Sequence, residues 1–280
     1  MTIRLVAVDM DGTILERGRE VRRELVESFI GMAERGVRVT TATGRPLRFQ
    51  LEILPANGLG AKVGTPQALM VDERELFLLD ASAERYAPHA AWNDAIRERW
   101  EALHPRAMAW LRRAELEALT RGWECALHED EQRMYERGLP TLTFKDAAQA
   151  ADARRWLSAE IAREGEGGGQ REGMDGSMAA ALSVNRNNRL VQVQDAHAGK
   201  GNVLHALAAL WGVAPNEVLA VGDSANDFSM LDGRHGFRAG APGNADDGIK
   251  EAVRAGGGYV AEERAGLGVL ETLRSYGLAG

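Results

Sequence analysis

The chain has 280 residues, 45% hydrophobic and 27% charged, which is ordinary for a globular protein and enough for two compact units. Its formal net charge of −7 disfavours nucleic acid or an anionic membrane as a partner. A single cysteine, no secretory signal pattern and no apolar run near the ~20 residues that span a bilayer together predict a cytoplasmic protein.

The N-terminal residues have the pattern of a βαβ unit. Residues 3–8 are apolar and β-branched, which predicts a buried parallel strand, and Asp9 and Asp11 follow it directly. Apolar residues at helical spacing predict a helix over about 21–32, and a second strand is expected over 37–42. Two carboxylates this close repel each other unless a cation or a proton lies between them, so the motif indicates a metal site.

The middle of the chain differs in composition. Five of its six tryptophans lie here, and "EGEGGGQREGMDGS" (164–177) is expected to be a flexible loop. Tryptophans at these positions are interpreted mainly as core residues. The expected helices and strands lie at residues 92–103, 107–120, 141–144, 146–163 and 178–184. This change in composition predicts a separately packed insertion.

Strands and helices alternate again near the C-terminus. The sequence predicts a helix over 203–211, a strand over 218–221 followed by "GDSAND" (222–227), a helix over about 246–254, and short strands near 237 and 259. This alternation is typical of a parallel sheet with right-handed crossovers. We therefore predict an α/β protein whose doubly wound parallel-sheet core, residues 1–82 and 187–280, carries an inserted α/β cap, residues 83–186.

Polar side chains follow several of the predicted strands. In a parallel sheet, strand ends far apart in sequence meet at one edge, where such folds bind ligands. Acidic oxygens there suit Mg²⁺, and a hydroxyl and an ammonium beside them suit phosphate. The residues concerned are Asp9, Asp11, Thr43, Lys200, Asp223, Asn226 and Asp227.

The order of these motifs resembles the haloacid-dehalogenase superfamily. "DMDGT" (9–13), "TGR" (43–45), "KG" (200–201) and "GDSAND" (222–227) are similar to its four motifs, and the long insertion and "GNADDGIKEAV" (243–253) resemble its Cof-like phosphatase branch. The run "DAHAGKG" (195–201) is closer to sucrose-phosphate and mannosyl-phosphoglycerate phosphatases, which favours a sugar phosphate as substrate. Cof-like chains often carry Asn-Gly after the third strand, whereas this chain has "ALMVDERELFLL" (68–79).

The resemblance implies a role for each matching residue. Asp9 is the implied nucleophile that forms an aspartyl-phosphate, and Asp11 the implied general acid and base. The implied Mg²⁺ ligands are the Asp9 carboxylate, the Asp11 backbone carbonyl and Asp223. Thr43, Gly44, Lys200 and Asn226 are the implied phosphate-binding residues. Asp227 is implied to hold these residues in place without contacting the metal or the phosphate itself.

Two further residues are candidates for contact with the substrate, Arg45 and His197. Each has a plainer interpretation, because Arg45 could tie down its loop and His197 could be a solvent-exposed loop residue. Each core motif, taken alone, also has a plainer structural interpretation, since Asp-Gly is a common turn and Thr43 could cap a helix.

The sequence thus predicts a Mg²⁺-dependent phosphatase acting on a small phosphorylated metabolite. Two alternatives stay open. A phosphomutase would use the same aspartyl-phosphate, and a non-catalytic phospho-ligand sensor could share the fold. The pairing of Asp11 with Asp9 argues against the sensor.

Overall fold

The computed structural model describes residues 2–16, 19–128, 132–133, 136–137, 139–167 and 181–279. The chain forms two compact units: the first comprises Met1–Asn93 and Gly199–Gly280, and the second Asp94–Ala198. Within the described ranges, no helix combines the length and the apolar character needed to cross a membrane.

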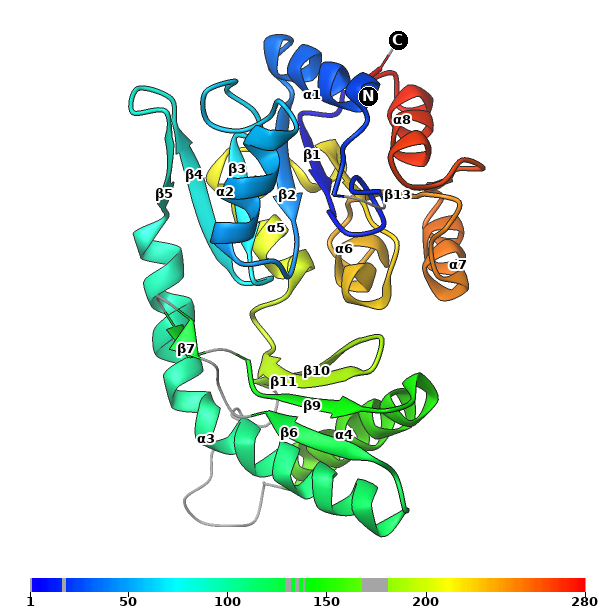
Figure 1. Cartoon of the computed structure of the whole chain (residues 1–280). Helices are drawn as coiled ribbons and strands as arrows, with labels where there is room; N and C mark the ends of the chain where they lie inside the picture. The colour runs from blue at the N-terminus through cyan, green and yellow to red at the C-terminus, as the bar shows by residue number, and fades with distance from the viewer. Residues whose placement is uncertain are drawn as a thin grey trace. The chain divides into compact units, whose positions relative to one another are not determined.

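The first unit is built on an eight-stranded sheet with the order β14-β13-β12-β1-β2-β3-β4-β5 (Figure 1). The six strands from β14 to β3 are parallel, and β4 and β5 extend the sheet as an antiparallel hairpin. The strands are β1 (Leu5–Val8), β2 (Arg38–Ala42), β3 (Ala68–Val71), β4 (Glu75–Asp80), β5 (Arg85–Pro88), β12 (Val218–Val221), β13 (Arg238–Ala241) and β14 (Tyr259–Val260).

Helices cover both faces of this sheet, because successive residues of a buried strand point to opposite faces. In β1, Val6 and Val8 pack on one face and Leu5 and Ala7 on the other. The first face is covered by α1 (Arg23–Glu34), α2 (Leu47–Ala56) and α8 (Ala265–Ser275). The second is covered by α5 (Lys200–Leu210), α6 (Phe228–Leu231) and α7 (Asp247–Ala255).

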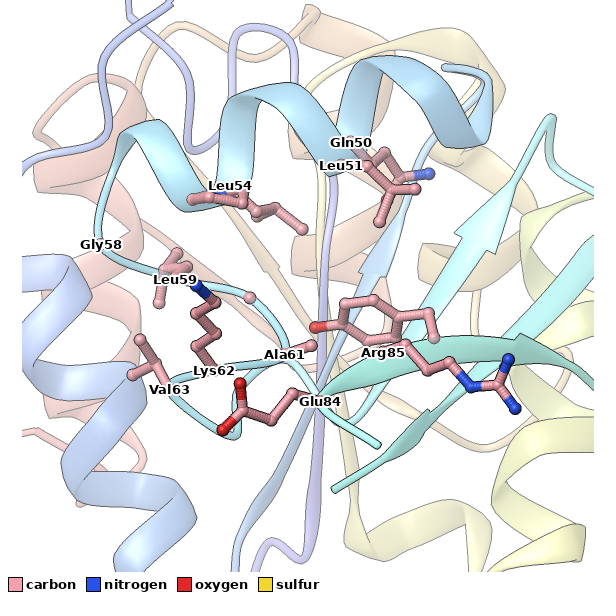
Figure 2. Close-up of a pocket in the computed structure, with 13 residues that line it drawn as sticks. Gln50, Leu51, Leu54, Gly58, Leu59, Ala61, Lys62, Val63, Glu84 and Arg85 are labelled. Carbon is pink, nitrogen blue, oxygen red and sulfur yellow. The ribbon is translucent and has the colours of Figure 1, made fainter. Parts of the chain in front are cut away.

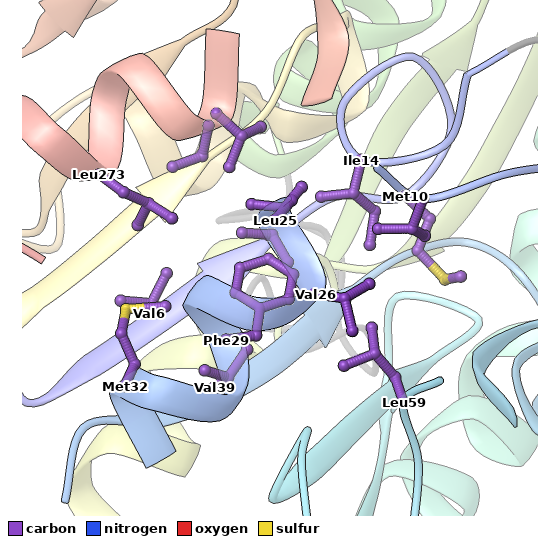
Figure 3. Packing of buried hydrophobic residues seen from close by; sticks show 14 of the residues in the cluster. Val6, Met10, Ile14, Leu25, Val26, Phe29, Met32, Val39, Leu59 and Leu273 are labelled. Atoms are coloured by element: carbon purple, nitrogen blue, oxygen red, sulfur yellow. The ribbon is translucent and has the colours of Figure 1, made fainter. Parts of the chain in front are cut away.

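The cluster on the first face shows why α1 forms where the sequence predicts it. Leu25, Phe29 and Met32 recur at helical spacing, and all three are buried. Figure 3 shows Phe29 among Val6, Val39 and other side chains of this cluster. Helix α1 therefore covers the strands that end in the polar motifs.

The second unit has an antiparallel sheet with the order β10-β11-β9-β6. Side chains of α3, α4 and the sheet form one hydrophobic cluster, which includes Trp100 and Trp110. The elements are α3 (Ala90–Thr120), β6 (Cys125–His128), β9 (Thr141–Phe144), α4 (Ala147–Gly167), β10 (Leu182–Asn187), β11 (Leu190–Asp195) and a separate pair, β7 (Gln132–Arg133) and β8 (Glu136–Arg137).

The predicted fold class, a doubly wound α/β core with a second α/β unit, is confirmed. The units divide at 93/94 and 198/199, whereas the sequence placed the boundaries at 82/83 and 186/187. Strand pairing explains why the boundaries lie further along the chain, because β5 pairs with β4 in the first sheet and β11 pairs with β9 in the second.

Several local predictions need correction. The two helices expected over 92–103 and 107–120 are one helix, α3, which continues through Pro105. Trp92 packs in the first unit, where its indole N–H donates to Arg74 O at 2.7 Å. Helix α4 extends to Gly167, so 164–167 is helical; the rest of the predicted loop lies outside the described residues.

Candidate active site

The turn after β1 brings its carboxylates close to the strand β12. Asp9 N–H donates to Val221 O at 2.9 Å, which continues the pairing with β12 one residue beyond the end of β1. Gly12 has φ +81°, and a Cβ there would lie 2.5 Å from Asp223 Oδ2. Glycine is therefore favoured at this position, because a side chain would be strained at this φ and the Asp223 carboxylate would have to move.

Lys200, the first residue of α5, is fully buried and joins two carboxylates. Its Nζ donates to Asp9 Oδ1 at 2.6 Å and to Asp227 Oδ1 at 2.5 Å. Burial by itself lowers the pKa of Lys200, but the attraction of Asp227 and Asp9 outweighs it and raises the pKa, so the ammonium stays charged. For Asp9, burial raises the pKa, and Lys200 opposes that effect. Lys200 is thus a buried ammonium held between the carboxylates of Asp9 and Asp227.

Asp223 and Asp227 complete an acidic cluster, in which oxygens of Asp9, Asp223 and Asp227 lie within 4.8 Å of one another. Thr13 Oγ1 donates to Asp223 Oδ1 at 2.9 Å. Burial, followed by repulsion from Asp227, raises the pKa of Asp223 to about 6. These oxygens could hold a divalent cation, which would also relieve the repulsion.

Asp227 differs from the other two acids, because both of its oxygens already have partners. Oδ1 accepts from Lys200, and Oδ2 accepts from the backbone N–H groups of Asp223 and Ser224, each at 2.9 Å. Asp227 therefore holds the turn and the lysine in place, while Asp9 and Asp223 remain as the cluster's candidate metal ligands.

Arg45 forms a two-point ion pair with Asp11. Its Nε donates to Asp11 Oδ2 at 2.7 Å and its Nη2 to Asp11 Oδ1 at 2.8 Å. The guanidinium also lies 4.6 Å from the centre of the Phe49 ring. Thr43 is buried, and its Oγ1 accepts from Arg45 N–H at 3.1 Å. The structure thus brings the predicted residues Asp11, Thr43 and Arg45 together.

Glu73 belongs to this site although the motifs do not contain it. Its Oε1 accepts from Asn226 Nδ2 at 2.7 Å, and a Cβ at Gly44 would lie 3.1 Å from the same oxygen. In the sequence, this role is indicated only by the acidic turn "VDER" (71–74). It stands where the chain departs from the Cof-like pattern, so the four motifs do not include it.

His197 lies in the second unit, in a cluster of its own. Arg99 donates to Asp195 through Nε at 2.7 Å and through Nη2 at 3.0 Å, and Nη2 lies 2.6 Å from His197 Nδ1. Asp195 is buried, and His197 is exposed. The histidine is therefore held by the second unit rather than by the acidic cluster.

A cavity of about 430 Å³ lies elsewhere in the first unit (Figure 2). It is lined by Leu51 and Leu54 of α2, by the loop around Lys62, and by Glu84 and Tyr86 near β5. None of the predicted site residues lines it. We place the candidate active site at the acidic cluster, because reaction chemistry needs the charged groups gathered there.

Comparison with known proteins agrees with this assignment. The family model for haloacid dehalogenase-like hydrolases matches residues 6–65 and 172–266. The chain belongs to this family. Its fold is similar to a sucrose-phosphatase from Synechocystis, solved with sucrose and phosphate: the TM-score is 0.67 at 18% identity, and 99% of each chain is covered.

Two curated relatives match over nearly the whole chain. The phosphoglycolate phosphatase of Methanothermobacter thermautotrophicus is 26% identical, covering 98% of this chain and 99% of the relative. That of Methanoculleus marisnigri is 23% identical, covering 98% and 97%. The predicted membership of the haloacid-dehalogenase superfamily and the predicted class, a phosphoric monoester hydrolase, are confirmed.

Proposed function

We propose that the protein is a Mg²⁺-dependent phosphatase that hydrolyses a small phosphorylated metabolite through an aspartyl-phosphate on Asp9. The observation that carries the proposal is the buried Lys200, held against Asp9 at 2.6 Å beside the acidic cluster. An anionic nucleophile and an anionic phosphate repel each other, and a fixed ammonium between them reduces that repulsion.

The residues present fit a magnesium ion. The donors are hard carboxylate oxygens, which Mg²⁺ prefers. Asp9 and Asp223 would hold the ion with the Asp11 carbonyl, since Asp227 is already bonded through both oxygens. When bound, the ion would neutralise charge on the phosphoryl oxygens.

In the first step, a carboxylate oxygen of Asp9 attacks phosphorus and the bond from phosphorus to the ester oxygen breaks. Asp11 gives its proton to the leaving oxygen, so an alcohol departs. Lys200, Thr43 and Asn226 bind the phosphoryl oxygens. Arg45 must release Asp11 for this role, because it occupies both oxygens of that carboxylate.

In the second step, water attacks the phosphorus of the aspartyl-phosphate. Asp11 takes the proton of the water, the bond from phosphorus to Asp9 breaks, and inorganic phosphate leaves. The same residue thus serves as acid and then as base, and both carboxylates return to their starting states.

Substrate choice is assigned to the second unit, residues 94–198, acting as the predicted cap. The first candidate substrates are phosphoglycolate, on which the two curated relatives act by name, and a sugar phosphate, which the sequence favours. Arg45 and His197 are the candidates for substrate contact. A cytoplasmic location stays a prediction.

The test is phosphate release from a panel containing phosphoglycolate, several sugar phosphates and p-nitrophenyl phosphate, with Mg²⁺ and with EDTA. We expect release that requires Mg²⁺ and a clear preference for one metabolite. Binding without release from any member would favour the sensor. Transfer of phosphate within a hexose phosphate primed with a bisphosphate would favour the mutase.

A further inference from the structure

Glu73 lies in a backbone conformation that its side chain does not favour. The turn between β3 and β4 is closed by a hydrogen bond from Arg74 N–H to Val71 O at 3.1 Å. Its two central residues, Asp72 and Glu73, have φ of 50° and 59°. Turns of this kind favour Asn-Gly or Asp-Gly, because a Cβ crowds the backbone at positive φ. A glutamate is therefore unexpected at the second position.

The turn nevertheless connects three of the active-site motifs. Glu73 N–H donates to Thr43 O at 3.1 Å, and Gly199 N–H donates to Glu73 O at 2.8 Å, directly before Lys200. Glu73 is 7% exposed, and its carboxylate accepts from Asn226 Nδ2. Both backbone bonds can form with any residue other than proline at this position, whereas the contact with Asn226 depends on the glutamate side chain.

The contact with Glu73 fixes the orientation of Asn226. Ser224 Oγ donates to Asn226 Oδ1 at 2.5 Å, while Asn226 Nδ2 donates to Glu73 Oε1. An amide nitrogen carries two N–H groups, so the second is available to a phosphoryl oxygen. Without an acceptor at Glu73, the amide would lose one of the two bonds that set its plane.

A carboxylate here has an electrostatic cost. The Lys200 ammonium already contacts the carboxylates of Asp9 and Asp227, and the negative charge of Glu73 also raises the pKa of Lys200. A phosphate entering this site meets the additional negative charge. An acid that strains the turn and repels the substrate requires a compensating role.

We propose that Glu73 is a positioning residue, which holds the Asn226 amide in the orientation that binds the phosphoryl group. The proposal rests on the proposed phosphatase activity. To orient Asn226, residue 73 needs only a hydrogen-bond acceptor. The negative charge of Glu73, by contrast, weakens the binding of phosphate. These two effects can be separated by substitution.

Three variants make the test: Glu73→Gly, Glu73→Gln and the matched control Asp72→Gly, which changes the neighbouring residue of the same turn. We would measure kcat and KM on p-nitrophenyl phosphate, the binding of inorganic phosphate by calorimetry, and the melting temperature. Calorimetry does not need turnover, so a wild type that binds phosphate but hydrolyses nothing would refute the proposed function and leave this inference testable.

For Glu73→Gly we expect kcat to fall about 10- to 100-fold, as when a residue supporting an active-site group is lost. Its melting temperature should stay within about 3 °C of wild type, since relief at positive φ offsets the lost hydrogen bond. Glu73→Gln should retain kcat within about threefold and bind inorganic phosphate several-fold more tightly, because the acceptor remains and the charge is gone. Asp72→Gly should stay within about twofold of wild type.

Three results would overturn the proposal. One is wild-type kcat in Glu73→Gly, and another is an equal loss in Asp72→Gly, which would assign the effect to the turn. The third is a Glu73→Gln variant as impaired as Glu73→Gly. Failure of both Glu73 variants to fold while Asp72→Gly folds would count with the third, since it would make the residue structural.

Discussion

Lys200 Nζ lies 2.6 Å from Asp9 Oδ1, and both side chains are buried. The two residues are 191 positions apart, and β1 and the start of α5 bring them together. Since Asp227 shares the same ammonium, loss of the lysine would leave two carboxylates facing each other without a cation.

The first prediction follows from this arrangement. Lys200→Met should lower the free energy of unfolding by about 3–5 kcal/mol in the absence of metal, because it leaves buried charges unpaired. Adding Asp227→Asn should recover part of the loss. Urea unfolding of the two variants and of wild type measures both effects. A loss below about 1 kcal/mol, the range of exposed ion pairs, would contradict the buried arrangement.

The second prediction concerns the nucleophile. Asp9→Asn keeps an oxygen that accepts from Lys200 but removes the attacking charge, so kcat should fall by more than about a hundredfold. The melting temperature should not fall, because a buried carboxylate whose pKa is raised by burial is replaced by a neutral amide. Phosphate release and thermal unfolding are measured on the same preparation. Hydrolysis within tenfold of wild type would remove Asp9 from this role.

The third prediction is a pH dependence of metal binding. Burial raises the pKa of Asp223 to about 6, so the carboxylate is mostly protonated at pH 5.5 and ionised at pH 7.5. Metal binds the ionised form, and affinity therefore rises with pH through this range. We expect Mg²⁺ to raise the melting temperature more at the higher pH.

The control for this measurement is Asp223→Asn, which can still accept from Thr13 but has no charge to titrate. Its response to Mg²⁺ should be small at both pH values. A variant with the full wild-type response would move the ligand role from Asp223 to another acid.

The fourth prediction tests whether Arg45 contacts the substrate or only stabilises the fold. Arg45 and Asp11 are both about half-exposed, so Arg45→Gln should change the free energy of unfolding by no more than about 1 kcal/mol. If Arg45 contacts the substrate, kcat/KM should fall about 10- to 100-fold through loss of a charge-assisted hydrogen bond. Kinetics on the preferred metabolite measure the effect.

Arg19→Gln is the matched control, because Arg19 also lies 4.6 Å from the centre of the Phe49 ring but forms its ion pair with Glu52. It should leave kcat/KM unchanged. Equal losses in the two variants would place the effect in the packing around Phe49 rather than in contact with substrate.

Several helices and strands of the core were predicted, because local patterns determine them, whereas α2, α6 and β5 were not. Apolar residues repeat at helical spacing in α1, and β1 and β12 are uninterrupted apolar runs. The insertion was predicted less well. Its helix α3 continues through Pro105, and tertiary packing of Trp100 and Trp110 on either side overrides the local preference for a break.

The sequence alone determined the identity of the candidate site, since Asp9, Lys200 and Asp223 stand in motifs whose order is specific. Their pairings follow from the tertiary structure. It joined Arg45 to Asp11, placed Lys200 between Asp9 and Asp227, and brought Glu73 to Asn226. The physical reason is that strand ends are local features, whereas hydrogen bonds between loops depend on how the sheet aligns distant segments, such as Glu73 and Asn226, which are 153 residues apart.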